Sequence, residues 1–219
     1  MLLEKARHEV VEVARAMYHR GLVVGTWGNV SRRQDDYLAI TPSGMDYEVI
    51  TPEDIIVINF QGDIIEGKWR PSTEWQLHGL IYEQQASAQG IVHTHSPYAA
   101  AFAVAGVNIP PVLEETAQML GGEVRVAAYA PAGTRELAEQ ALIAIQGRQA
   151  CLLANHGMVA VGRDGWQALQ ACQVAEKSAM VTILAGQLGN VNILDQTEVD
   201  KLRAGFAHYG QTKLDQREG

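Results

Sequence analysis

Cysteine is scarce in this chain, and its scarcity excludes one class of small domain. Cys151 and Cys172 are the two cysteines, and each lies inside an apolar segment. Secreted domains that depend on disulfides carry more cysteines on a shorter chain. We therefore expect both thiols to be reduced core residues of a cytoplasmic protein.

Positive charge is also in short supply. Lysine and arginine number 17 against 25 aspartate and glutamate residues, which gives a net charge of −8. No basic stripe is therefore available to contact the backbone of a nucleic acid, and we expect no nucleic-acid partner. The deficit does not exclude a small phosphorylated ligand, because backbone amides and a local metal ion can hold a phosphate on an acidic protein.

The sequence has no apolar run that approaches membrane-spanning length. Its first segment, Met1 to Lys5, carries charge almost at once, so neither a signal peptide nor a membrane anchor is expected. Linkers, low-complexity segments and internal repeats are also absent. These absences indicate one domain over residues 1–219 that is large enough to bury a substantial core.

The sequence does contain a regular alternation of helical and strand-like periodicity. Helices are expected over residues 2–20, from a cap at Ser72 or Thr73 to about residue 85, and over 98–105, 135–146, 166–188 and 198–209. Strands are expected over 37–40, 55–60, 64–65, the run that starts at 90, 151–154 and 158–161. Short turns between several strands favour hairpins. The predicted fold class is α/β, a single domain with a central, largely antiparallel sheet flanked by helices.

Two histidines separated by one residue close the apolar run 90–92. Alternate residues of a strand share one face, so His93 and His95 can point into one pocket from a rigid element. His156 follows a second apolar run, 150–154. Imidazole nitrogen suits zinc and other first-row ions, and three protein ligands leave a position for substrate. Each histidine could instead be a structural core residue, but the spacing favours a metal site. We expect the other histidines to be surface or packing residues: His8, His19, His78 and His208.

Glu74 precedes a predicted helix, in the segment Pro71-Ser72-Thr73-Glu74-Trp75. A carboxylate is electrostatically favourable at the start of a helix, so it could be an ordinary first-turn residue. Beside a metal, the same carboxylate could be a fourth ligand, a general base, or both in turn.

Three short turns offer hydroxyls and backbone amides without any lysine or arginine. They are the segments 26–29, 41–44 and 71–73. Such turns can form a site for an anion, although each alone is more often an ordinary turn. Only their combination indicates a phosphate site.

These motifs together resemble the class II aldolase and adducin family. The resemblance rests on Gly25-Thr26-Trp27-Gly28-Asn29-Val30-Ser31, Ile40-Thr41-Pro42-Ser43-Gly44, Pro71-Ser72-Thr73-Glu74, His93-Thr94-His95 and Asn155-His156-Gly157. Their order and spacing are most similar to the bacterial L-fuculose-1-phosphate aldolase branch of the family. The similarity extends over essentially the whole chain, as far as Phe206-Ala207-His208-Tyr209-Gly210.

The resemblance implies a zinc-dependent aldolase, with manganese and cobalt as other candidate metals, and a homotetramer with active sites at subunit interfaces. The implied reaction cleaves a short ketose 1-phosphate reversibly, through an enediolate, to dihydroxyacetone phosphate and an aldehyde. Glu74 would both ligate the resting metal and transfer the proton. The other implied metal ligands are His93, His95 and His156. The implied phosphate-binding residues are Gly28, Asn29, Ser43, Gly44, Ser72 and Thr73.

One segment departs from the fuculose aldolase pattern. Those enzymes have a tyrosine that protonates the aldehyde oxygen from the next subunit, and the matching segment 112–118 has no tyrosine. Glu115 could replace it as the acid, which would require a raised pKa, or it could be a surface charge on a helix. Tyr209 matches the C-terminal tyrosine of those enzymes and is a further catalytic candidate.

Other activities of the family remain as alternatives. The methylthioribulose-1-phosphate dehydratases place a catalytic glutamate near the position of Glu115, so a sugar-phosphate dehydratase stays open. The 4-epimerases have an aspartate where Glu74 stands and a longer chain, which counts against them. A non-catalytic binding module like the adducin head domain is expected to lack the metal ligands, and here all of them are present.

Overall fold

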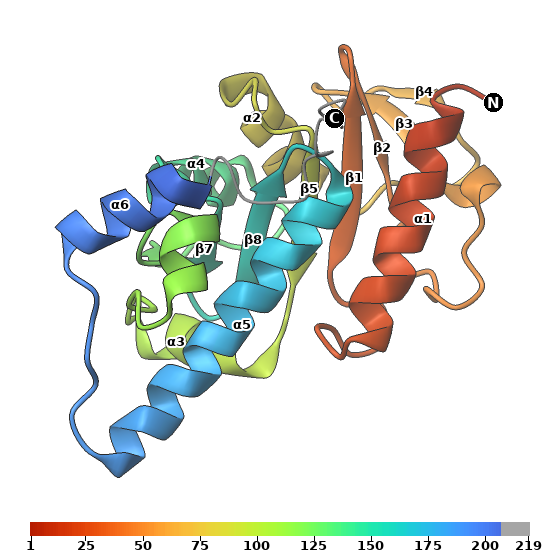
Figure 1. Ribbon diagram of the computed structural model, residues 1–219. Helices are drawn as coiled ribbons and strands as arrows, with labels where there is room; N and C mark the ends of the chain where they lie inside the picture. Colours follow the sequence, from red (N-terminus) through yellow and green to blue (C-terminus); the bar gives the residue numbers. More distant parts are fainter. Residues whose placement is uncertain (207–219) are drawn as a thin grey trace, which may run out of the picture.

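The structure, a computed structural model, describes residues 1–206, and in these residues the strands form one eight-stranded sheet in the order β4-β3-β2-β1-β5-β8-β7-β6 (Figure 1). The strands are β1 (Asn29–Gln34), β2 (Tyr37–Ile40), β3 (Ile56–Asn59), β4 (Ile64–Glu66), β5 (Gly90–Thr94), β6 (Arg125–Ala127), β7 (Ala150–Leu153) and β8 (Gly157–Gly162). The helices are α1 (Glu4–His19), α2 (Trp75–Gln84), α3 (Pro97–Ala105), α4 (Arg135–Ile145), α5 (Gly165–Leu188) and α6 (Gln196–Phe206), with short helical turns at Pro52–Asp54 and Thr116–Leu120.

The sheet is antiparallel throughout, except that β6 pairs with β7 in parallel. This arrangement confirms the predicted fold class. The sequence did not predict β6, because that strand has three residues of which only Ala127 is buried, too short for an alternating pattern to be recognised.

Helices cover both faces of the sheet, as Figure 1 shows. One apolar cluster joins α1, α3 and α5 to the sheet, and a second joins α2 and α4 to it. Successive side chains of a strand point to opposite faces, so Val92 of β5 packs in the first cluster and Ile91 in the second. By the same alternation, His93 lies on the face covered by α2. None of the described helices has the length and apolarity to cross a membrane.

The two cysteines occupy opposite faces of the sheet. Cys151 belongs to the cluster under α2 and α4, and Cys172 to the cluster under α1, α3 and α5. Both are fully buried and unpaired, which confirms the prediction of free core thiols.

The start of α2 differs by a residue or two from the prediction. The helix begins at Trp75, so Glu74 rather than Ser72 or Thr73 occupies the position before the first helical residue. The Ser72 hydroxyl still takes part, because its Oγ accepts a hydrogen bond from the backbone N–H of Glu74 at 3.3 Å. Glu74 therefore lies where the chain turns from a loop into the helix, with its side chain free to face β5.

Candidate active site

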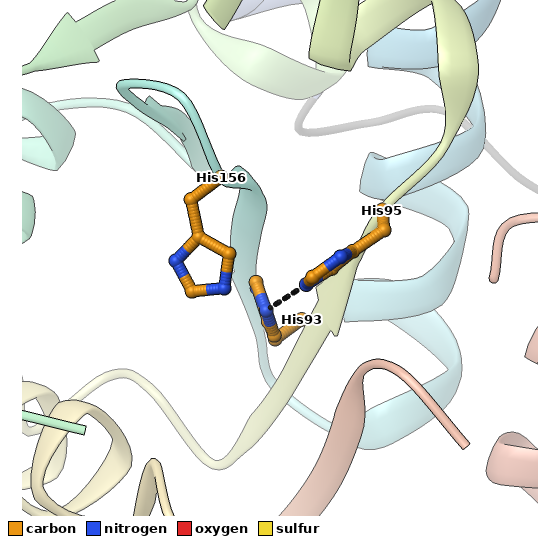
Figure 2. A group of neighbouring side chains, drawn as sticks. All are labelled: His93, His95 and His156. Carbon is orange, nitrogen blue, oxygen red and sulfur yellow. Dashed lines mark hydrogen bonds between the residues drawn. The ribbon is translucent and has the colours of Figure 1, made fainter. Parts of the chain in front are cut away.

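Three histidines meet at one end of β5 and β8. His93 is in β5, His95 follows that strand, and His156 lies in the turn between β7 and β8. Figure 2 shows the three rings gathered together; each pair is T-shaped, and the ring centroids of each pair are 4.8 Å apart. One ring nitrogen from each residue lies within 4.8 Å of the other two. The structure thus brings together the three histidines that the sequence indicated as candidate metal ligands.

Backbone geometry at the turn before β8 makes this meeting possible. Asn155 has a left-handed backbone (φ 56°), which suits asparagine and places His156 toward β5. A Cβ at Gly157 would lie 2.3 Å from the carbonyl oxygen of Thr94 and 3.1 Å from the His95 ring. Only glycine therefore lets the turn come this close to the histidine pair.

Hydrogen bonding fixes which nitrogen of His93 is available as a ligand. The Nδ1–H of His93 donates to the carbonyl oxygen of Met158 at 2.9 Å. A carbonyl only accepts, so Nδ1 must carry the proton and Nε2 faces the cluster. His93 Nε2 lies 2.9 Å from Nε2 of His95. A backbone carbonyl behind a metal-binding histidine is a common way to fix its tautomer and orientation.

Glu74 completes the cluster from the N-terminal end of α2. Its Oε2 lies 3.1 Å from His93 Nε2, and its Oε1 lies 3.5 Å from His156 Nε2. Oε2 also accepts a hydrogen bond from Asn29 Nδ2 at 2.9 Å, whereas Oε1 is buried without any hydrogen-bond partner. Burial alone would raise the pKa of Glu74, but His93, His156 and the Asn29 bond together hold that pKa well below its ordinary value.

Charge in the cluster is shared unequally among the histidines. Burial, together with the neighbouring histidines, lowers the pKa of His95 to about 3 and that of His156 to about 4. Burial acts in the same direction on His93, but Glu74 outweighs it and raises the pKa of His93. His95 and His156 are therefore neutral at pH 7, with nitrogen lone pairs available to a cation.

These groups fit a divalent metal ion. Imidazole nitrogens and a carboxylate converge, and the buried Oε1 of Glu74 has no hydrogen-bond partner. Three histidines and a carboxylate form a ligand set typical of zinc and neighbouring ions. The ligands would be His93, His95, His156 and Glu74.

The three predicted phosphate turns meet in the same pocket as the histidines. The backbone N–H of Ser72 donates to Thr41 and that of Ser43 to Arg70, each at 3.0 Å, so two of the turns are tied together. A Cβ at Gly28 (φ 105°) would lie 2.7 Å from the carbonyl oxygen of His93, so glycine is needed for the third turn to approach β5. The pocket measures about 240 Å³ and is lined by Thr26, Trp27, Gly28, Asn29, Pro42, Ser43, Gly44, Ser72, Thr73, Glu74, His95, Ala132 and His156.

A larger groove elsewhere on the chain contains none of these groups. It measures about 1080 Å³, is wide open, and lies along α2, α4 and β8. Volume alone would favour this groove, but the converging polar and titratable groups that indicate a reactive site are all in the smaller pocket.

Within one chain, the structure does not bring Glu115 to this pocket. The Oε1 of Glu115 pairs with Lys177 Nζ of α5 at 2.6 Å, and that bond lowers the pKa of Glu115. Within one chain, Glu115 therefore lacks the raised pKa that a proton donor would need. Tyr209 lies outside the described residues 1–206.

The sequence did not predict the buried hydrogen bonds of His78. We expected a surface or packing residue, but its side chain is fully buried and makes two hydrogen bonds. Its Nε2 lies 2.5 Å from Asn29 Oδ1 and its Nδ1 lies 2.6 Å from Ser31 Oγ. The signal was present in the spacing, because Glu74 and His78 are four residues apart on α2 and Asn29 and Ser31 are two apart on β1. Nothing in the sequence showed that these two faces meet.

The buried His78 makes stability depend on pH in a direction that can be measured. Burial lowers its pKa from 6.5 to about 3 in the folded protein. Below pH 6.5 the unfolded chain takes up a proton that the folded chain refuses, so stability falls as the pH drops from 6.5 toward 3. His78→Gln removes this group. We expect the wild type to lose about 3 kcal/mol more stability than the variant between pH 7 and pH 4.

Urea unfolding of the metal-free proteins at several pH values measures this difference. All other titrating groups are common to both proteins, so the difference between their two curves isolates His78. Parallel curves would show that the pKa of His78 is the same in the folded and the unfolded protein.

Comparisons with known proteins agree with the pocket. Residues 8–183 match the family described as Class II Aldolase and Adducin N-terminal domain. The chain is 37% identical to a 5-deoxy-D-ribulose 1-phosphate aldolase of Bacillus thuringiensis serovar kurstaki, over 96% of this chain and all of that one. It is also 37% identical to a 5-methylthioribulose-1-phosphate/5-deoxyribulose-1-phosphate aldolase of Rhodospirillum rubrum, over 93% and 92% of the two chains. A solved structure of an L-fuculose 1-phosphate aldolase superposes with a TM-score of 0.91 at 33% identity, over 94% of this chain and 98% of that one.

Proposed function

Because the chain belongs to the class II aldolase and adducin family, whose matched relatives are aldolases, we propose that it reversibly cleaves a short ketose 1-phosphate to dihydroxyacetone phosphate and an aldehyde. One observation carries the proposal. A carboxylate with an unpartnered oxygen packs against three histidines, in the same pocket as three turns rich in backbone amides and hydroxyls. The proposed acid–base group, metal site and phosphate site would therefore share one pocket.

The histidine cluster would hold the metal, which we propose to be zinc, with manganese or cobalt as the other candidates. A divalent ion bound there would act as a Lewis acid that polarises the ketose carbonyl and stabilises an adjacent enediolate. Its protein ligands would be His93, His95 and His156, with Glu74 as a fourth before substrate enters.

Glu74 would move the proton. In the synthetic direction its carboxylate takes a proton from the hydroxymethyl carbon of dihydroxyacetone phosphate, and the electron pair of the broken C–H bond forms the enediolate. In the cleavage direction it returns that proton after the carbon–carbon bond has broken. Oε1 suits this role, because it is buried and has no hydrogen-bond partner.

The turns would hold the substrate phosphate through backbone amides and hydroxyls. The pocket lining includes Gly28, Ser43, Gly44, Ser72 and Thr73 and has no lysine or arginine. Backbone N–H groups in glycine-containing turns can bind an anion without a cationic side chain. The side chain of Asn29 is engaged by Glu74 and His78, so this residue would serve the phosphate chiefly through its backbone.

We propose that the single domain of residues 1–219 assembles as a cytoplasmic homotetramer whose active sites lie at subunit interfaces. The family resemblance supports the tetramer, and exposed apolar side chains on the loops around the pocket are consistent with it. Val24 is 80% exposed and Tyr129 is 65% exposed. An interface would also bring Glu115 or Tyr209 of one subunit to the pocket of another, where either could protonate the aldehyde oxygen.

Proton exchange tests the reaction without knowledge of the aldehyde. Dihydroxyacetone phosphate is incubated in heavy water with the zinc-loaded protein, and NMR follows loss of one hydroxymethyl proton. We expect stereospecific exchange of one of the two protons. If no exchange occurs and the protein instead releases water from a ketose 1-phosphate, the activity is that of a dehydratase.

The position of Trp27 in the pocket indicates which part of the substrate would determine specificity. Its ring lies 5.8 Å from that of His95, lines the pocket and is 66% exposed. We propose that it contacts an apolar terminal group of the ketose, such as the methyl or methylthio end found in the substrates for which the two 37% identical relatives are named. Trp27→Ala should lower kcat/KM for 5-methylthioribulose 1-phosphate about 10-fold, the effect of losing one apolar contact.

A matched exposed tryptophan serves as the control. Trp166 of α5 is 41% exposed and does not line this pocket, so Trp166→Ala should leave kcat/KM unchanged. Trp27→Ala should also leave exchange into dihydroxyacetone phosphate unchanged. If exchange falls as much as cleavage does, Trp27 contacts the phosphate half of the substrate instead.

A further inference from the structure

A line of buried polar side chains runs from the interior of the protein to Glu74. Tyr82 OH lies 2.8 Å from Ser31 Oγ, which lies 2.6 Å from His78 Nδ1. His78 Nε2 lies 2.5 Å from Asn29 Oδ1, and Asn29 Nδ2 lies 2.9 Å from Glu74 Oε2. Each of the five side chains is at most 6% exposed. The line alternates between α2 and β1: Tyr82 and His78 belong to the helix, Glu74 precedes its first residue, and Ser31 and Asn29 belong to the strand.

The chemistry of the groups sets the direction of the bonds between Glu74, Asn29 and His78. A carboxylate only accepts, so Asn29 must turn its NH2 toward Glu74 and its oxygen toward His78. That oxygen requires a proton on His78 Nε2. The His78 ring is fully buried and its two nitrogens face Asn29 Oδ1 and Ser31 Oγ rather than a carboxylate, so a neutral ring whose Nδ1 accepts from the Ser31 hydroxyl is the favoured form. Ser31 Oγ can then accept from Tyr82, whose hydroxyl also donates to the backbone carbonyl of Ser31 at 3.1 Å.

We propose that His78, Ser31 and Tyr82 are positioning residues that lock the Asn29 amide with its NH2 toward Glu74. Glu74 Oε2 is thereby held as a permanent hydrogen-bond acceptor, and Oε1 alone is left to exchange a proton with substrate. This inference rests on the proposed role of Glu74 as the base. The residues act through Asn29 and do not touch the substrate.

The opposite orientation of the Asn29 amide would be unfavourable, and for this reason its orientation has to be fixed. A flipped amide would place its oxygen against Oε2 of Glu74, and two acceptors would face each other in a buried site. Bonds aligned in one direction also strengthen one another. The line is not a path for protons to solvent, because Tyr82 at its far end is fully buried.

The tautomer of His78 is the first test, and it does not depend on any enzymatic activity. Metal-free protein with 15N-labelled histidine is examined by long-range proton–nitrogen NMR, with the His78→Gln spectrum used to assign the signal. We expect a neutral ring with the proton on Nε2 from pH 5 to pH 8. A proton on Nδ1, or a charged ring in this range, would overturn the proposal.

Variants then test the effect on the base. His78→Leu removes the donor to Asn29, whereas His78→Gln can present an N–H close to the place of Nε2. We expect His78→Leu to lower kcat for deuterium exchange about 10- to 100-fold, the usual effect of losing a supporting hydrogen bond behind a metal site. His78→Gln should retain most of the rate. The KM and the zinc affinity should change little in both variants.

A double-mutant cycle distinguishes a connected line from independent packing effects. Tyr82→Phe should slow exchange when His78 is present and have no further effect beside His78→Leu. Tyr37→Phe makes the same chemical change outside the line and should leave the rate unchanged. Additive effects, or a loss that falls on KM or zinc affinity, would contradict the proposal.

Two outcomes of these experiments would change either the choice of variant or the conclusion. If His78→Leu fails to fold, Ser31→Ala takes its place, and the proposal then requires a slower exchange rate in that variant. If the wild type shows no exchange at all, the proposed function has failed, while the tautomer measurement still decides whether the line exists as described.

Discussion

Glu74→Gln should leave a folded, metal-binding protein that no longer exchanges deuterium into dihydroxyacetone phosphate. The amide is nearly isosteric and can still accept the Asn29 hydrogen bond, but it cannot take up a proton at neutral pH. Positioned acid–base groups contribute about 10²- to 10⁴-fold to the rate, and we expect a loss in kcat of that size. NMR in heavy water measures the loss, and circular dichroism with zinc titration verifies fold and metal binding.

Two further glutamate variants test whether the loss of exchange is specific to Glu74. Glu139→Gln changes an exposed residue of α4 that pairs with Arg135, and it should leave exchange unchanged. Glu115→Gln tests the other carboxylate candidate. A residue that protonates the aldehyde oxygen takes part in cleavage and not in exchange, so Glu115→Gln should slow cleavage alone if it has that role. An active Glu74→Gln protein would remove Glu74 from the role of base.

Removal of the metal should slow deuterium exchange at least as much as Glu74→Gln does. A chelator should reduce exchange about 10³-fold or more, since a Lewis acid stabilises the developing charge by several kcal/mol and each 1.36 kcal/mol is a tenfold change in rate. Zinc should restore the rate. Zinc at about 100 times its Kd should also raise the melting temperature of the metal-free protein by about 5–10 °C.

The His95→Ala variant tests whether zinc-dependent exchange and the zinc-dependent rise in melting temperature both arise at the histidine cluster. The side chain of His95 is half-buried whereas His93 is fully buried, so this variant should fold, lose exchange, and show no zinc-dependent rise in melting temperature. His19→Ala changes an exposed histidine of α1 that pairs with Glu48, and it should behave like the wild type. If chelation leaves exchange intact, the reaction does not use a metal at this cluster.

Much of the histidine cluster could be predicted from the sequence because strand periodicity is local. His93 and His95 are two residues apart, so their common direction follows from the geometry of β5 alone. His156 joins them because β8, which begins just after its turn, pairs with β5, as the pairing of Thr94 with Met158 shows. The order of the strands in the sheet does not follow from any local pattern.

The supporting residues were beyond local reasoning because their partners come from elements far apart in the sequence. His78 and Asn29 are 49 residues apart, and only the packing of α2 on β1 makes them neighbours. The same holds for Glu115, whose partner Lys177 lies 62 residues along the chain. A lone polar residue on an apolar helix face says little until the residue opposite it is known.

The placement of β5 in the middle of the sheet determines how rarely its backbone becomes exposed to solvent. Residues 90–94 are all buried and are paired on both sides, with β1 and with β8. Amide hydrogens in such a strand exchange with solvent only when the whole sheet opens. The backbone of His93 should therefore be among the last parts of the chain to become accessible to proteases or solvent, whereas the side chain of Trp27 is 66% exposed. Substitutions at Trp27 would then change the wall of the pocket without disturbing the strand that carries His93.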